Sequence, residues 1–82
     1  MKENSMNKAK IRNLATILNS SKTVRFTHNN FFYEILKSAD TGYVVNIYSS
    51  NELDEYGEYL EENCIDGGLC TGNTENAIEF ML

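Results

Sequence analysis

Between residues 23 and 48 the sequence contains three short runs rich in β-branched and aromatic residues, separated by only a few turn-forming residues, and the first run alternates apolar and polar side chains. Successive side chains of a strand point to opposite faces, so this alternation is typical of strands with one buried face. The runs cover residues 23–28, 31–37 and 43–48. Asn29 and Asn30 suit a tight turn because asparagine tolerates positive φ, and residues 40–42 supply a second turn. Such short links predict an antiparallel meander of three strands.

Helices are predicted on both sides of these strands. Ser5 suits the N-cap of a helix that ends near Asn19, because a serine side chain accepts a hydrogen bond from the first helical turn. Apolar side chains recur in it at the i, i+3, i+4, i+7 spacing of one buried stripe. That stripe consists of Ile11, Leu14, Ala15 and Leu18. After the strands, Ser49 and Glu52 match a capping box and predict a second helix over residues 49–63. Its apolar stripe consists of Leu53, Tyr56 and Leu60.

The last part of the chain predicts a third, shorter helix. Gly67 and Gly68 are interpreted as the stop of the second helix, and Asn73 can cap a helix over residues 73–81. Its inward side chains are expected to be Ala77, Ile78 and Met81. The sheet face and the helix stripes each need an apolar partner. The predicted fold class is therefore α+β, a three-stranded antiparallel sheet packed against helices in the order α-β-β-β-α-α. At 82 residues, of which 41% are hydrophobic, we expect a single domain over residues 1–82.

The charges are divided unevenly along the chain. Residues 1–40 hold seven Lys and Arg side chains and three acidic ones, which gives 7 − 3 = +4. Residues 41–82 hold nine acidic side chains and no basic one, so the total is 4 − 9 = −5. The second half is a concentrated anionic segment, which suggests a function for its negative charge.

The predicted second helix carries five carboxylates on the face opposite its apolar stripe. They belong to Asp54, Glu55, Glu58, Glu61 and Glu62. Like charges four residues apart destabilise a helix by about 0.2–0.5 kcal/mol per pair, and no lysine relieves that repulsion here. Such a stripe indicates a cationic partner; the alternative is an ordinary solvated helix face. Tyr59 lies near the edge of the stripe and joins the expected partner-binding residues, because tyrosine is enriched at interfaces.

Other residues leave two alternatives open. Tyr48 and Tyr59 are the tyrosines expected at a contact surface, which suits an interaction module or regulator that binds protein through its tyrosines and sheet. Cys64 and Cys70 could form a redox pair or, with His28, supply three metal ligands, which suits a thiol switch or an enzyme. The paired short spacings and the fourth ligand of a zinc site are lacking, and so are a Ser-His-Asp set and a phosphate-binding glycine loop with a lysine. We therefore expect no catalysis, cofactor or metal.

The predicted order of helix, three strands and helix resembles the double-stranded RNA-binding domain, whose second helix contacts RNA phosphates through basic residues. Here that helix is acidic, so direct binding of nucleic acid is not expected. With this order, a small size and a reversed charge, the chain is similar to the small acidic anti-CRISPR proteins of phages. Some of these occupy the site where a CRISPR effector reads its protospacer-adjacent motif. The resemblance implies DNA mimicry toward the arginines that read this motif, through the five carboxylates above. The basic first helix, with Lys8, Lys10 and Arg12, departs from a uniformly anionic mimic.

The sequence thus predicts a phage-type inhibitor of a CRISPR or other nucleic-acid-binding defence complex, which blocks target-DNA binding by acidic mimicry. Its expected partner is a basic nucleic-acid-binding protein or complex, such as a CRISPR effector. No run approaches the roughly 18 apolar residues of a membrane span. The first residues lack the apolar stretch and cleavage site of a secretory signal. The expected location is the cytoplasm of the host cell.

Overall fold

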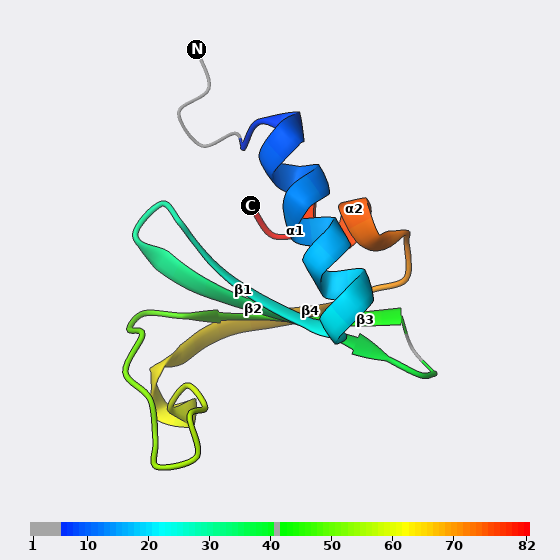
Figure 1. Cartoon of the computed structure of the whole chain (residues 1–82). Helices are drawn as coiled ribbons and strands as arrows, with labels where there is room; N and C mark the ends of the chain where they lie inside the picture. The colour runs from blue at the N-terminus through cyan, green and yellow to red at the C-terminus, as the bar shows by residue number, and fades with distance from the viewer. Residues whose placement is uncertain (1–5, 41) are drawn as a thin grey trace.

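One antiparallel sheet with two helices on one of its faces forms the structure, a computed structural model that describes residues 6–40 and 42–82 (Figure 1). The order of elements is α1 (Lys8–Ser21), β1 (Thr23–His28), β2 (Phe31–Ser38), β3 (Gly42–Tyr48), the 3-10 helix η1 (Glu61–Asn63), β4 (Cys64–Cys70) and α2 (Thr74–Glu79). The strands are arranged in the order β1-β2-β3-β4. The predicted α+β class is confirmed, with four strands where the sequence predicted three.

The first three strands form the predicted meander. Asn29 and Asn30 have φ angles of 56° and 69°, the left-handed geometry that a two-residue hairpin turn requires. This turn fixes the register of the hairpin, in which Thr23 lies opposite Leu36 and Arg25 opposite Glu34. Of the second predicted turn, Thr41 lies outside the described residues.

The core lies between the sheet and the two helices. The predicted stripe of α1 is buried, as are Ala77 and Ile78 of α2, and Met81 packs against the same cluster. The sheet contributes Val24, Phe26, Tyr33, Ile35, Tyr43, Val45, Ile47 and Cys70. We call the opposite face of the sheet, which neither helix covers, the outer face. The alternation of the strands places Arg25, Glu34 and Tyr48 on it.

The helix ends differ slightly from those predicted. Asn7 caps α1 through its side chain, which accepts a hydrogen bond of 2.8 Å from the backbone N–H of Lys10. Ser5, the predicted cap, lies outside the described residues. The helix continues to Ser21 and ends at Lys22 with a φ of 67°, so the two serines after Asn19 do not interrupt it. Asn73 caps α2 as predicted, by accepting a hydrogen bond from Asn76.

The predicted helix over residues 49–63 is wrong. The segment forms an irregular loop with one isolated β-bridge between Leu53 and Tyr59, and only η1 at its end is helical. Gly57 has a φ of 80°, which interrupts a helix, and glycine within a helix costs about 1 kcal/mol relative to alanine. The predicted capping box is replaced by other contacts, because Ser50 Oγ accepts from Glu52 N and Ser49 Oγ donates to Asn63 O.

The interpretation of Gly67 and Gly68 as a helix stop is also wrong, since both lie within β4. A Cβ at Gly68 would lie 2.9 Å from Cε2 of Phe80 and 3.4 Å from Sδ of Met81. The missing side chain therefore allows the residues after α2 to pack closely across the strand. A register shift between Ile47 and Tyr48 adds a bulge to the pairing of β3 with β4.

Candidate functional site

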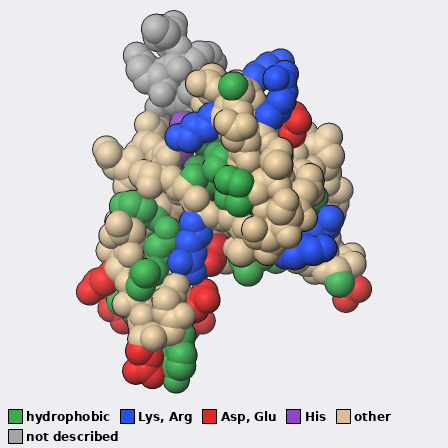
Figure 2. Space-filling view, in the orientation of Figure 1, with side chains coloured by type: hydrophobic (Ala, Val, Ile, Leu, Met, Phe, Trp, Pro, Cys, Tyr) green, Lys and Arg blue, Asp and Glu red, His purple; other side chains and the backbone are tan. Residues whose placement is uncertain are grey.

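Six carboxylates and no basic side chain are gathered in the loop that joins β3 to β4, which we call the acidic loop (residues 49–63). The carboxylates belong to Glu52, Asp54, Glu55, Glu58, Glu61 and Glu62, and all six residues are exposed. In Figure 1 the loop hangs away from the face that carries the helices. Figure 2 shows acidic side chains gathered at the same lower left end of the molecule, next to exposed hydrophobic ones. The loop is therefore a projecting anionic surface.

The acidic loop has a defined backbone. Asp54 and Glu58 are joined by a backbone hydrogen bond of 2.8 Å, from the N–H of Asp54 to the carbonyl of Glu58. The Oδ1 atom of Asp54 accepts from the N–H groups of Tyr56 and Glu58, at 2.8 and 3.0 Å. The base of the loop is closed by a hydrogen bond of 2.9 Å from Ser49 N to Asn63 O. These contacts form a small hairpin whose tip turns at residues 54–57.

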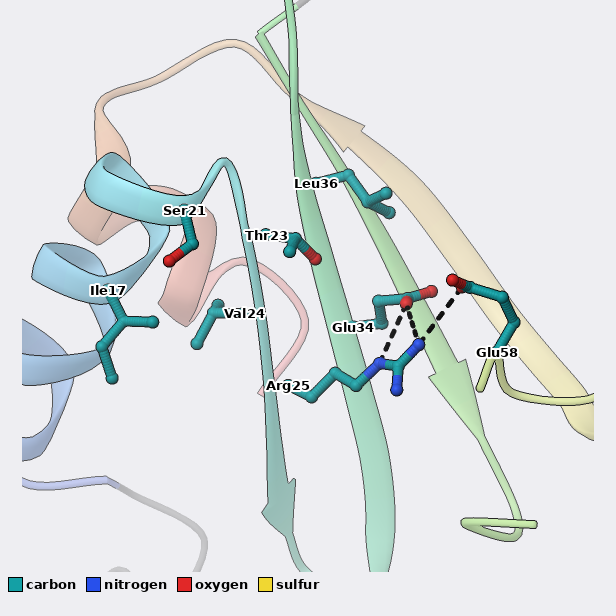
Figure 3. Close-up of a pocket in the computed structure, with 8 residues that line it drawn as sticks. All are labelled: Ile17, Ser21, Thr23, Val24, Arg25, Glu34, Leu36 and Glu58. Atoms are coloured by element: carbon teal, nitrogen blue, oxygen red, sulfur yellow. Dashed lines mark hydrogen bonds and ion pairs between the residues drawn. The ribbon is translucent and has the colours of Figure 1, made fainter. Parts of the chain in front are cut away.

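Arg25 fastens this hairpin to the outer face of the sheet. Its Nε donates to Oε2 of Glu34 at 3.1 Å, and its Nη2 lies 3.1 Å from the same oxygen (Figure 3). Its Nη1 donates to the carbonyl of Gly57 at 3.0 Å, and Nη2 donates to Oε1 of Glu58 at 3.2 Å. Partial burial lowers the pKa of Arg25, but the two carboxylates raise it by more, so the net shift is upward and the guanidinium stays charged.

Aromatic stacking completes this attachment. The guanidinium carbon of Arg25 lies 4.5 Å from the ring centroid of Tyr59, and the rings of Tyr59 and Tyr48 are 4.7 Å apart. The hydroxyl of Tyr48 donates to Oε1 of Glu34 at 3.4 Å. Glu34, only 6% exposed, therefore receives hydrogen bonds from two side chains, as a buried carboxylate requires. We call Arg25, Glu34, Tyr48 and Tyr59 the clamp.

Because of the clamp, we expect the free energy of unfolding to fall as the pH rises through the alkaline range. Burial, followed by the charge of Glu34, raises the pKa of Tyr48 to about 12, whereas an unfolded tyrosine titrates near 10. The folded state then holds a proton that the unfolded state has lost, so we expect the Tyr48 contribution to stability to be lost as pH rises from about 10 to about 12. The measurement is urea unfolding across this range.

Tyr48→Phe is the matched variant for that measurement and should unfold with a weaker dependence on alkaline pH. Burial also raises the pKa of Tyr33 and of Tyr59, so a part of the dependence should remain. If the free energy of unfolding fell equally steeply with alkaline pH in the wild type and in the variant, Tyr48 would not be the source of the dependence.

The predicted partner-binding residues have different positions. Asp54 directs its Oδ1 atom into the turn of the hairpin, and Glu58 lies against Arg25. Glu55, Glu61 and Glu62 are exposed without an ion pair within the described residues. Of the two tyrosines expected at a contact surface, Tyr48 is buried, which contradicts the expectation, and Tyr59 is half-buried. Tyr56, predicted to face inward, is instead 80% exposed at the tip of the hairpin.

The cysteines and the histidine are not brought together. Cys64 and Cys70 are free thiols at opposite ends of β4, about 20 Å apart at the ordinary rise of a strand. His28 lies in β1, where its ring packs edge-on against Tyr33 at 6.1 Å, and its Nε2 is buried without a hydrogen-bond partner in the described part of the chain. Among residues 6–40 and 42–82 no three His, Cys, Asp or Glu side chains lie close enough to hold a metal ion.

Comparison of the chain with protein-family models, with curated proteins and with solved structures found no match. In the part of the chain that the structure describes, neither helix has the length and apolar character needed to cross a membrane.

Proposed function

We propose that this chain is a non-catalytic inhibitor of a nucleic-acid-binding defence complex, such as a CRISPR effector, and that its acidic loop occupies the site where the complex binds target DNA. The observation that carries this proposal is the projecting loop itself. It combines six exposed carboxylates with an ordered backbone and with exposed Leu53 and Tyr56. The cytoplasm of a host cell is the location that such a partner requires.

The arrangement of charge favours a basic partner. Of the six carboxylates only Glu58 has an ion pair within the described residues, and the loop itself supplies no cation. Their mutual repulsion persists in the free protein and would be relieved by a surface lined with Lys or Arg. Sites that bind DNA or RNA are lined in this way, because they neutralise phosphates.

The fixed backbone of the acidic loop supports DNA mimicry over the alternative of a solvated acidic surface that binds no partner. A flexible acidic segment loses conformational entropy when it binds, at a cost of about 1–2 kcal/mol for each backbone residue that becomes fixed. Here Arg25 and the bridge between Leu53 and Tyr59 already fix the hairpin. The loop would thus present its carboxylates in one arrangement, and this preorganisation favours tight binding.

Charge reversal on the loop tests this proposal. Glu55→Lys combined with Glu62→Lys should weaken capture of the partner from a host lysate by about thirtyfold or more, because each lost contact is worth roughly 1 kcal/mol. In the described part of the chain neither side chain makes a hydrogen bond or an ion pair, so the fold should persist. The matched control is Glu75→Lys with Glu79→Lys, the same change of charge on exposed positions of α2.

The outcome is read from the proteins that the wild type retains. A basic nucleic-acid-binding protein that is released at moderate salt, lost with the loop variant and kept with the α2 variant is the expected result. Equal capture by the two folded variants would exclude the acidic loop as the binding surface.

A second candidate function is a protein-interaction module or regulator that binds through the sheet. Leu36, Val44 and Leu69 lie side by side in register on the outer face, and Leu69 is 59% exposed. The tyrosines expected for this mode, Tyr48 and Tyr59, are engaged in the clamp instead. In the same capture experiment this function would give a partner that resists high salt and is lost with Leu69→Lys.

A further inference from the structure

The free edge of β1 is a second surface that the proposed function does not use. β1 pairs with β2 and has no strand on its other side within the described residues. The backbone carbonyl of Lys22 accepts a hydrogen bond of 2.9 Å from the N–H of Lys37. Because the bonding pattern of an antiparallel ladder alternates, Thr23, Arg25 and Thr27 direct their backbone N–H and C=O groups away from β2. The edge thus presents three donors and three acceptors in a regular row.

A groove follows this edge. It has a volume of about 500 Å³ and wraps around β1 from the helix side to the outer face. Figure 3 shows Ile17 and Val24 on the helix side of the strand, and Leu36, Arg25 and Glu58 on the other side. Ile17 is 47% exposed although it is a large apolar side chain. The groove therefore has an apolar wall next to a row of unpaired backbone groups.

Two of the usual protections of an edge strand, a proline and a β-bulge, are missing at β1. Proteins guard such edges with prolines, bulges, charged side chains or short strands. The six pairs of β1 and β2 run without a register shift, and the strand contains no proline. The one permanent charge of β1 belongs to Arg25, whose side chain lies over the outer face of the sheet and forms ion pairs with Glu34 and Glu58. The edge of β4, by contrast, follows a bulge and two glycines.

We infer that the edge of β1 binds an extended segment of a partner protein by strand addition, with apolar side chains on the helix side and basic side chains on the outer side. The charge of the groove selects the basic side chains, since its lining contains Glu34 and Glu58 against Arg25 alone. The net charge of −5 on each copy disfavours a second copy of this chain as the occupant. Strand addition gives affinity through backbone bonds and specificity through alternate side chains. This binding mode is independent of whether the acidic loop also contacts the partner.

The probe for this inference is a synthetic peptide with blocked ends and the sequence Val-Lys-Val-Ser-Val-Lys-Val. When it pairs antiparallel with β1, its lysines lie opposite Thr23 and Thr27, and its serine lies opposite Arg25. Titration of the isotope-labelled protein by NMR should give saturable shifts at the amides of these three residues, with protection from hydrogen exchange. Two derivatives of the peptide test its backbone hydrogen bonds to β1. In one, the backbone nitrogens of both lysines and of the serine are methylated; in the other, the backbone nitrogens of the two inner valines are methylated.

Only methylation of lysine and serine removes donors that face β1, so that derivative should bind at least about tenfold more weakly than the other. Leu36→Lys should weaken binding of the unmodified peptide by about tenfold through repulsion of its lysines, whereas Leu69→Lys, on the same face but outside the groove, should not.

Three results would overturn the inference: no saturable shifts, equal binding by the two methylated peptides, or shifts confined to the acidic loop. Shifts at the β1 amides that grow with protein concentration in the absence of peptide would assign the edge to a second copy and would also overturn it. The variant with Glu55→Lys and Glu62→Lys separates this inference from the proposed function, because its β1 edge should still bind the peptide.

Discussion

Replacement of Arg25 by methionine is expected to lower the free energy of unfolding by about 3 kcal/mol, because it leaves the buried carboxylate of Glu34 without its cation. Since a third of the Arg25 side chain is exposed, the loss of stability is expected at the lower end of the range seen when one partner of a buried ion pair is removed. The change also removes the contacts of the guanidinium with Gly57, Glu58 and Tyr59. We therefore expect faster hydrogen exchange at the amides of Asp54 and Glu58 together with the loss of stability.

Two further variants separate the parts of this effect. Arg12→Met removes an exposed arginine of α1 and should change stability by about 0.5 kcal/mol or less. Glu34→Gln added to Arg25→Met removes the stranded charge and should recover part of the lost stability, although the exchange at the loop should stay fast. If Arg25→Met unfolds at the same urea concentration as Arg12→Met and its amides at Asp54 and Glu58 exchange no faster, the clamp does not hold the acidic loop.

The second large effect is expected in the core. Leu18→Ala should cost about 3 kcal/mol, because the side chain is fully buried between α1 and the sheet and its removal leaves a cavity. Its neighbour Ile17 is 47% exposed, so Ile17→Ala should cost about 0.5 kcal/mol or less. Chemical unfolding of both variants measures the difference. Equal losses would mean that α1 presents a different face to the sheet.

Periodicity predicts those elements whose local pattern and tertiary burial agree. The stripe of α1 and the alternation of β1 specify the same buried faces that the structure contains. The acidic loop was predicted as a helix because Leu53, Tyr56 and Leu60 repeat at helical spacing. Gly57 and the turn capped by Asp54 are the local signals against that helix. β4 could not be found in this way, since Gly67 and Gly68 weaken the pattern of a strand and their role depends on Phe80.

The clamp could be predicted from the sequence in part. A two-residue turn at Asn29 and Asn30 fixes the register of the hairpin, and that register alone places Arg25 opposite Glu34. The contacts of Arg25 with Gly57 and Tyr59 could not be foreseen, because they depend on how the acidic loop folds back over the sheet. The exposure of Tyr56 could not be foreseen either, because it too depends on how the acidic loop folds back over the sheet.

The central claim, that the acidic loop takes the place of nucleic acid, is tested most directly by competition. The measurement is the affinity of the captured partner for its own nucleic acid at increasing concentrations of this protein and at fixed salt. The account predicts that the apparent Kd for nucleic acid rises in proportion to the protein added, and that the variant with Glu55→Lys and Glu62→Lys loses this effect. A ternary complex in which the Kd for nucleic acid is unchanged would contradict it.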